Sequence, residues 1–172
     1  MNHKTIGDSV PNVTFRTRQN GEWMEVSSDT VFKGRTVVVF AIPGAFTPTC
    51  SSTHLPGFLA LEPELKEAGV DDIYCLSVND SFVMNAWAKD QDAEGIIKML
   101  PDGSGHFSRG MGLLVDRDDL GFGYRSWRYA MLVVDGVIRE LFVEDFNAKG
   151  DPFQVSDADT MLSAVEKQRR AA

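Results

Sequence analysis

The N-terminal half of the chain places apolar segments between polar breaks, as expected for strands and helices that share one core. Residues 13–15 and 22–26 predict two short strands, and Asn20-Gly21 between them is a strong signal for a hairpin turn. Residues 35–42 form a nearly continuous apolar run rich in β-branched side chains. Such a run predicts a strand buried on both faces. Residues 72–78 predict a second buried strand.

A helix is predicted after each of these two buried strands. The first strand breaks at Pro43-Gly44 and leads into a helix. After the second strand, Asn79-Asp80 can cap another helix. The residues that we expect on the apolar face of this second helix are Phe82, Val83, Ala86 and Trp87.

The C-terminal part predicts a hairpin followed by a helix. Residues 128–134 and 137–143 predict antiparallel strands joined by Asp135-Gly136, a signal for a type I′ turn. Residues 156–159 resemble a capping box, with Asp159 in place of the preferred Glu or Gln. The last helix carries apolar residues at helical spacing, namely Ala158, Met161, Leu162 and Val165.

The order of these elements predicts an α/β fold. Strand, helix, strand, helix, hairpin and helix fit a mixed central sheet flanked by helices, with an N-terminal hairpin. The thioredoxin-like fold is the simplest match to this order. The 172 residues contain no repeat or long linker, so residues 1–172 are expected to form one domain.

Composition and charge exclude several classes of function. The chain is 43% hydrophobic and 24% charged, with a net charge of -8, which disfavours binding to nucleic acid or to an anionic membrane. No apolar run reaches the roughly 20 residues that span a bilayer. The N-terminus lacks the apolar segment of a secretory signal, so we expect a cytoplasmic protein. Three histidines and two distant cysteines show no metal-ligand spacing, and neither a metal nor another cofactor is expected.

The most informative segment is PGAFTPTC, residues 43–50. Thr47 is suited to the N-cap of a helix and Pro48 to its first position, which places Cys50 at the third position. A helix N-terminus carries free N–H groups and a partial positive charge, which stabilise a thiolate. Cys50 is therefore the candidate nucleophile.

Easier ionisation alone does not make a fast thiol catalyst. The gain in thiolate is largely offset because the nucleophilicity of a thiolate falls with its basicity, which leaves an improvement of only about a few-fold. Hydrogen-bond donors to the leaving group are worth far more, about 100- to 1,000-fold each. The candidate donors are the Thr47 hydroxyl, the N–H groups of Thr49 and Cys50, and one arginine.

Three segments resemble one known family. Pro43, Thr47 and Cys50 match the P-x-x-x-T-x-x-C motif of peroxiredoxins. Residues 43–58, 75–87 and 128–144 are similar to the peroxiredoxin-5 subfamily, which includes bacterial members that depend on glutathione and glutaredoxin. The resemblance covers most of the chain and implies a thioredoxin-like thiol peroxidase that acts on hydrogen peroxide and alkyl hydroperoxides without a cofactor.

The resemblance assigns roles by position. Cys50 matches the peroxidatic cysteine, which becomes a sulfenic acid, and Thr47 would hydrogen-bond the thiolate and the peroxide. Pro43 would shield the sulfur from water. Arg128 matches the arginine that holds the thiolate and polarises the peroxide, a role suited to a permanent cation. The residues expected to contact the peroxide are Gly44, Thr49, Cys50 and Arg128.

Three further residues are weighed against plain structural roles. His54 follows Cys50 by four residues on the same helical face, a spacing that would suit a Cys/His catalytic pair. The resemblance instead makes His54 a supporting polar group. Cys75 lies in an apolar strand and is expected to be structural. Arg125 is a weaker functional candidate than Arg128.

The sequence also bears on how the enzyme is regenerated. Some relatives carry a resolving cysteine near the C-terminus, but residues 145–156 contain none. Other relatives carry a fused glutaredoxin domain, whereas this chain ends at Ala172. The hypothesis is therefore a one-cysteine cycle with glutathione or glutaredoxin as the reductant. The resemblance also implies a homodimer, with Phe46 and Pro48 exposed near the rim of the site.

Two other functions compete with the peroxidase hypothesis. A thiol-disulfide oxidoreductase that acts on proteins is disfavoured because the chain has no CxxC pair. A redox sensor or holdase that uses Cys50 oxidation as a switch begins with the same chemistry. Such a sensor would stop after one equivalent of peroxide, so the number of turnovers separates it from a peroxidase.

Overall fold

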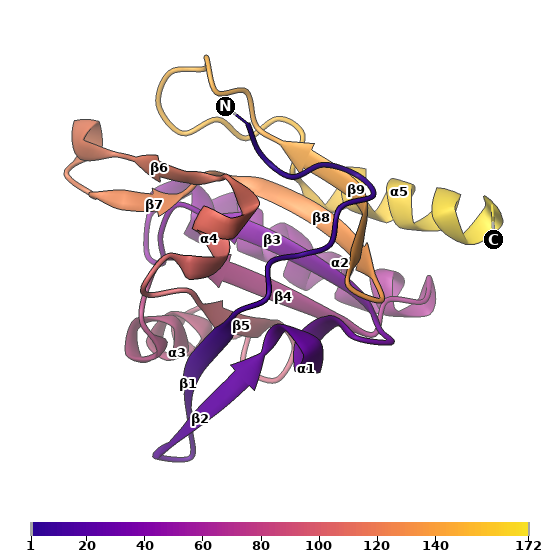
Figure 1. Ribbon diagram of the computed structural model, residues 1–172, viewed down its shortest axis with the longest axis horizontal. Coiled ribbons are helices and arrows are strands. Elements are labelled where there is room, and N and C mark those ends of the chain that lie inside the picture. Colours follow the sequence, from indigo (N-terminus) through magenta and orange to yellow (C-terminus); the bar gives the residue numbers. More distant parts are fainter. Residues whose placement is uncertain (1, 172) are drawn as a thin grey trace.

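The computed structural model describes residues 2–171 and is built around a five-stranded sheet (Figure 1). The strand order is β5-β4-β3-β8-β9. Their bounds are β3 Thr36–Ile42, β4 Asp72–Ser77, β5 Lys98–Pro101, β8 Tyr129–Val134 and β9 Val137–Val143. Strands β3, β4 and β5 are parallel, whereas β8 runs antiparallel to both β3 and β9. This mixed sheet with its flanking helices confirms the predicted thioredoxin-like α/β fold.

The central strand β3 is buried on both faces, which explains its continuous apolar run. Val38, Phe40 and Ile42 face one part of the core, together with side chains from α2 (Leu55–Glu67), α3 (Ser81–Asp90) and α5 (Ala158–Ala171). Val37 and Val39 face the other part, which includes side chains of α1 (Ser28–Phe32) and α4 (His106–Met111). Because side chains alternate along a strand, β3 joins two hydrophobic cores.

The structure has three hairpins within residues 2–171, one inside the central sheet and two beside it, and two of their turns were predicted. Strands β1 (Thr14–Gln19) and β2 (Glu22–Ser27) pair through Asn20-Gly21, whose φ angles are 51° and 78°. Asp135-Gly136 joins β8 to β9 with φ angles of 49° and 76°. Two successive positive φ angles are what a type I′ turn requires, so both turn predictions are confirmed. The β6 (Leu114–Asp116) and β7 (Tyr124–Ser126) hairpin, with a 3₁₀ turn at Asp118–Leu120 (η2), was not predicted.

The predicted apolar face of helix α3 is wrong in part. The buried apolar side chains are Met84, Trp87 and Ala88, whereas Ala86 is exposed and Phe82 is 58% exposed. Phe82 packs edge-on against Trp23 of the N-terminal hairpin at a ring distance of 5.6 Å. The N-cap is correct, because the Asp80 carboxylate accepts from the Val83 N–H at 2.9 Å.

The predicted capping box before helix α5 is also wrong. Asp157, rather than Ser156, caps the helix, because its carboxylate accepts from the Thr160 N–H at 3.1 Å and from the Thr160 hydroxyl. The Ser156 hydroxyl donates to the Glu144 carboxylate instead. The predicted apolar positions of this helix are confirmed, with Met161 among the fully buried side chains.

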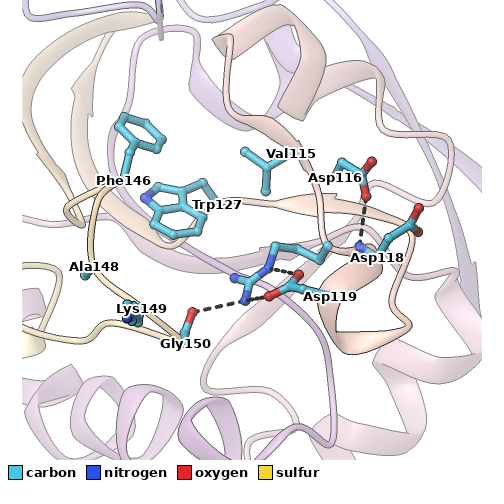
Figure 2. A pocket seen from close by; sticks show the side chains of 10 residues that line it. Val115, Asp116, Asp118, Asp119, Trp127, Phe146, Ala148, Lys149 and Gly150 are labelled. Atoms are coloured by element: carbon cyan, nitrogen blue, oxygen red, sulfur yellow. Dashed lines mark hydrogen bonds and ion pairs between the residues drawn. The ribbon is translucent and has the colours of Figure 1, made fainter.

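Residues 145–157, which follow Glu144 after β9 and lead into α5, are called the strap below. A hollow of about 710 Å³ lies between the strap and the β6–β7 hairpin. Figure 2 shows the residues that line it. Trp127 and Phe146 stack in its wall at a ring distance of 5.3 Å. The buried Arg117 donates to the Gly150 carbonyl at 3.0 Å and so ties the strap to the body of the protein.

None of the helices within residues 2–171 combines the length and the apolar character that crossing a membrane requires.

Candidate active site

Cys50 lies at the start of the helix that follows β3. Helical backbone begins at Pro48, so Cys50 has the predicted third position. Residues 50–54 then form one π-helical turn, in which the Leu55 N–H donates to the Cys50 carbonyl. Phe46, just before the helix, has a φ of 67°, an uncommon value for a bulky residue. Backbone strain and π-turns are both concentrated at functional sites.

Thr47 directs its hydroxyl at the sulfur of Cys50. The Thr47 Oγ1 lies 2.9 Å from the Cys50 Sγ and 2.7 Å from the Gly44 carbonyl oxygen. One hydroxyl hydrogen serves one acceptor at a time, so a thiolate competes with this carbonyl for it. Thr47 occupies the predicted N-cap position, but its hydroxyl donates instead of accepting from a backbone N–H, which corrects the capping expectation.

Arg128 brings a buried positive charge to the same sulfur. It precedes β8 and is 1% exposed. Its Nη2 lies 3.3 Å from the Cys50 Sγ, and its Nη1 lies 2.7 Å from the His54 Nδ1. The Asp151 carboxylate accepts from Nη2 at 2.7 Å and from Nε at 3.2 Å. Burial opposes the charge, but the neighbouring Cys50 and Asp151 hold the pKa of Arg128 above its usual value.

His54 is a neutral link in this network. Its Nε2 lies 2.8 Å from the Ser156 carbonyl oxygen, which can only accept, so this nitrogen carries the hydrogen. Its Nδ1 then accepts from Arg128. Burial and the charge of Arg128 lower the pKa of His54 to about 3, against a weaker opposing effect of the hydrogen bond to Ser156. A neutral ring engaged at both nitrogens suits the supporting role better than acid–base catalysis.

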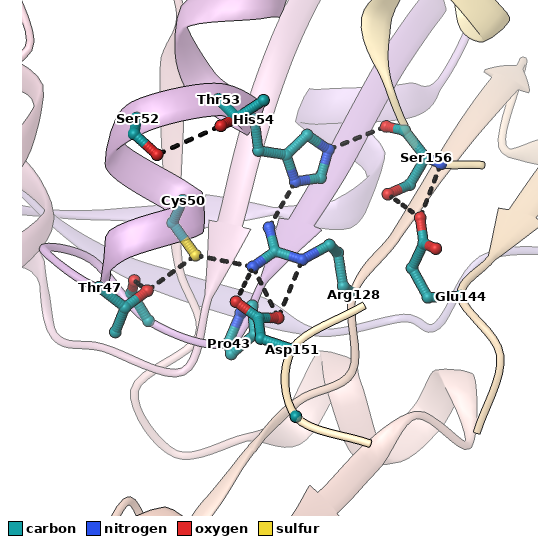
Figure 3. A network of polar contacts seen from close by, with 12 residues as sticks. Pro43, Thr47, Cys50, Ser52, Thr53, His54, Arg128, Glu144, Asp151 and Ser156 are labelled. Atoms are coloured by element: carbon teal, nitrogen blue, oxygen red, sulfur yellow. Dashed lines mark hydrogen bonds and ion pairs between the residues drawn. The ribbon is translucent and has the colours of Figure 1, made fainter. Parts of the chain in front are cut away.

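Glu144 anchors the far end of the network and was missed by sequence reasoning. It is 1% exposed, and its carboxylate accepts from the N–H groups of residues 154–156 and from the Ser156 hydroxyl, at 2.6–3.0 Å. These donors satisfy a buried carboxylate without a cation. Figure 3 shows the chain of contacts in order: Glu144, Ser156, His54, Arg128 and Cys50.

The other residues predicted for the site lie around the Cys50 loop. Pro43 and Gly44 are buried and Thr49 is half-buried. Arg125, the weaker of the two arginine candidates, donates to the Pro43 carbonyl at 3.3 Å and so contacts the loop that carries Cys50. A Cβ added to Gly44 would lie 2.8 Å from the Arg125 Nη1, which shows how closely the loop packs on this side chain.

Asp151 is the second residue that sequence reasoning missed. It lies in the middle of the strap, 23 residues from Arg128 in the chain, and no motif marked it. Cys75, by contrast, lies inside β4 as predicted, fully buried, and burial raises the pKa of its thiol well above the usual range. Within residues 2–171, no group of three or more His, Cys, Asp or Glu side chains is arranged to hold a metal ion.

The arrangement suits nucleophilic chemistry at sulfur. Cys50 is fully buried, so a thiolate there depends on the protein for its stabilisation. Thr47 and Arg128 provide that stabilisation with a hydroxyl and a charged donor. The same donors can stabilise the negative charge that develops on a leaving oxygen.

Comparisons with known proteins agree with this chemistry. Residues 5–162 match the model of the redoxin family. The hybrid peroxiredoxin hyPrx5 of Haemophilus influenzae is 56% identical over 164 residues, which cover 95% of this chain and 67% of that protein. A peroxiredoxin of Synechocystis is 51% identical over 171 residues, covering 92% of this chain and 90% of that protein.

A solved structure matches equally well. Reduced Prx3 of Vibrio vulnificus in complex with hydrogen peroxide superposes with a TM-score of 0.87 at 44% identity, over 95% of this chain and 99% of that chain. The fold, the site and the relatives lead to the same conclusion. The chain belongs to the redoxin family, and within it to the peroxiredoxins of the peroxiredoxin-5 type, which are thiol peroxidases; its peroxidatic cysteine is Cys50, beside Arg128.

Proposed function

We propose that this peroxiredoxin reduces hydrogen peroxide and alkyl hydroperoxides in a one-cysteine cycle that glutathione, alone or with glutaredoxin, completes. The observation that carries the proposal is the contrast between its two cysteines. The Cys50 Sγ lies between the Thr47 hydroxyl and Arg128, whereas Cys75 is enclosed within a strand of the core. Both are free thiols, and the strap contains no cysteine.

The first half of the cycle oxidises Cys50. The thiolate attacks one peroxide oxygen, the O–O bond breaks, and the sulfur becomes a sulfenic acid. The departing oxygen takes a proton and leaves as water or an alcohol. Arg128 and Thr47 stabilise the charge on this oxygen, Pro43 excludes water, and Gly44 and Thr49 border the peroxide.

The second half restores the thiol. The thiolate of glutathione attacks the sulfenic sulfur, water leaves, and a mixed disulfide forms. A second thiol, from glutathione or glutaredoxin, then attacks the sulfur of glutathione and releases the Cys50 thiolate. Each reduced peroxide oxidises two thiols of the reductant to a disulfide, so the cycle is complete without Cys75.

Three further expectations complete the proposal. Residues 1–172 act as one domain, and the protein works in a reducing, cytoplasm-like compartment, where free thiols persist. It also forms a homodimer through the face that carries Phe46 and Pro48, which are both exposed. Sedimentation of a strict monomer at micromolar concentration would count against the dimer.

The test is multiple-turnover consumption of hydrogen peroxide by the wild type, Cys50→Ser and Cys75→Ser. Each protein is assayed with glutathione plus glutaredoxin and, separately, with thioredoxin. We expect many turnovers with glutathione for the wild type and for Cys75→Ser, and none for Cys50→Ser. A folded Cys75→Ser protein that stops turning over would make Cys75 a resolving cysteine. Consumption of a single equivalent with every reductant would favour the redox sensor.

A further inference from the structure

Asp151 is held against the same guanidinium that contacts the sulfur. Its two carboxylate oxygens lie 2.7 and 2.8 Å from the Arg128 Nη2, and one of them lies 3.2 Å from Nε. Phe153, two residues further along the strap, packs over Arg128 and places its ring 4.8 Å from that of His54. The middle of the strap is therefore seated on the network that surrounds Cys50 (Figure 3).

The donors of Arg128 are nearly all engaged in this arrangement. A guanidinium has five N–H groups. Asp151 takes the Nε hydrogen and one Nη2 hydrogen, the Cys50 Sγ takes the other Nη2 hydrogen, and His54 takes one Nη1 hydrogen. Only one N–H, on Nη1, is left for a peroxide oxygen, so the peroxide and the carboxylate compete for the same cation.

The charges in the site make this competition matter. Arg128 is the cation in contact with the sulfur, and His54 stays neutral because burial lowers its pKa to about 3. Arg125 lies on the other side of the loop, against the Pro43 carbonyl. Asp151 is already paired with Arg128 through Nη2, and the Cys50 sulfur contacts the same nitrogen. Ionisation of the sulfur therefore places a second anion on this cation.

We propose that Asp151 is a positioning residue that acts on the peroxidase site through Arg128: it holds the guanidinium in place and opposes ionisation of Cys50 by its negative charge. The inference rests on the role of Arg128 in the proposed function and deepens it. The strap thereby sets how much thiolate is present, although none of its residues takes part in the bond changes.

Titration of the thiolate tests the inference directly. The absorbance of the thiolate at about 240 nm is followed with pH for the wild type and Asp151→Asn, and the signal of Cys50→Ser is subtracted. The Asp151 carboxylate and the Cys50 sulfur both contact the Nη2 of Arg128, and a like charge within about 4–6 Å shifts a titration by about one pH unit or more. The thiolate midpoint of Asp151→Asn should therefore lie about one unit below that of the wild type.

Two matched variants separate charge from shape. Asp151→Glu keeps the negative charge and should restore the wild-type midpoint. Asp145→Asn removes a charge from an exposed position on the same strap, where the carboxylate accepts from the Asn147 N–H, and should leave the midpoint unchanged. An unchanged midpoint in folded Asp151→Asn, or an equal shift in Asp145→Asn, overturns the inference. If Asp151→Asn does not fold, Asp151→Ser removes the same charge and takes its place.

Single-turnover oxidation by hydrogen peroxide, without any reductant, provides the second readout. The pH profile of the oxidation rate should move with the thiolate midpoint in Asp151→Asn, again by about one pH unit. If the wild type is oxidised at a normal rate and the pH profile of Asp151→Asn is not displaced, the role of Asp151 is refuted and the proposed function is not. Failure of wild-type Cys50 to be oxidised refutes the proposed function instead.

Discussion

Cys50 and Cys75 have equal burial but opposite surroundings. Both are fully buried and both belong to the same hydrophobic cluster. Cys50 lies at a helix start, with a hydroxyl and a guanidinium on its sulfur, whereas Cys75 lies in the middle of β4 between two parallel strands. The difference shows that the hydrogen-bond donors around a buried thiol, and not its exposure, determine whether it can serve as a nucleophile.

The largest expected difference is in thiol labelling. With iodoacetamide at neutral pH, native protein should be alkylated at Cys50 at least about 1,000-fold faster than at Cys75. Burial raises the pKa of the Cys75 thiol well above its usual range, so this thiol ionises readily only when the sheet opens, which costs a large part of the global stability. Mass spectrometry of labelled peptides measures both rates. Comparable alkylation rates of the two cysteines would show that their surroundings do not control reactivity. Labelling in denaturant is the control, because both thiols are then exposed.

A smaller effect is expected when the surroundings of Cys50 are made more like those of Cys75. Thr47→Val keeps the shape of the side chain but removes the hydroxyl at 2.9 Å from the sulfur. A hydrogen bond to a charged group is worth about 1.5–3 kcal/mol, so oxidation by peroxide should slow by about 10- to 100-fold. Thr47→Ser restores the hydroxyl and should stay within about three-fold of the wild type. Stopped-flow measurement of the oxidation rates tests this prediction. If Thr47→Val reacts at the wild-type rate, the hydroxyl does not contribute to the difference in reactivity between Cys50 and Cys75.

The smallest effect is on stability at acid pH, through His54. The pKa of His54 is about 3 in the folded protein, against 6.5 for an ordinary histidine such as that of the unfolded chain. As the pH falls, the unfolded chain therefore binds a proton at His54 before the folded protein does. Stability is therefore lost between pH 6.5 and about 3, and the loss from pH 7 to pH 5 is about 2 kcal/mol.

His54→Asn cannot titrate, and its carboxamide oxygen can accept from Arg128. Urea unfolding at pH 7 and pH 5 should show that this variant loses about 2 kcal/mol less than the wild type over that interval. Other acidic groups titrate in both proteins, so the difference isolates His54. Equal losses in the two proteins would mean that His54 is protonated in the folded state.

The sequence predicted those parts of the fold that are encoded locally. Both type I′ turns, the strands buried on two faces and the position of Cys50 in its helix follow from adjacent residues. Strand β5 was missed because it has four residues and ends at Pro101, which is too short for a pattern. In helix α3, Phe82 and Met84 belong to two overlapping apolar stripes, and only tertiary packing shows which stripe is buried.

The site was predicted only where a motif marks it. Thr47 and Cys50 lie within one short segment, and Arg128 was found through a family resemblance. Asp151 and Glu144 meet their partners through long-range contacts in a polar segment without periodicity. Their roles depend on how the strap folds back onto the sheet, and a local pattern carries no information about that.

The polar attachment of the strap has a thermodynamic consequence. Arg117 holds Gly150, Arg128 holds Asp151, and Glu144 holds residues 154–156, so most of its attachments are hydrogen bonds and an ion pair. Apart from Phe146 on Trp127 and Phe153 beside His54, these contacts are polar, so detaching the strap exposes less apolar surface than unfolding the core. Both the heat capacity and the denaturant dependence of an opening scale with that surface. Opening of the strap should therefore depend less steeply on urea than global unfolding does.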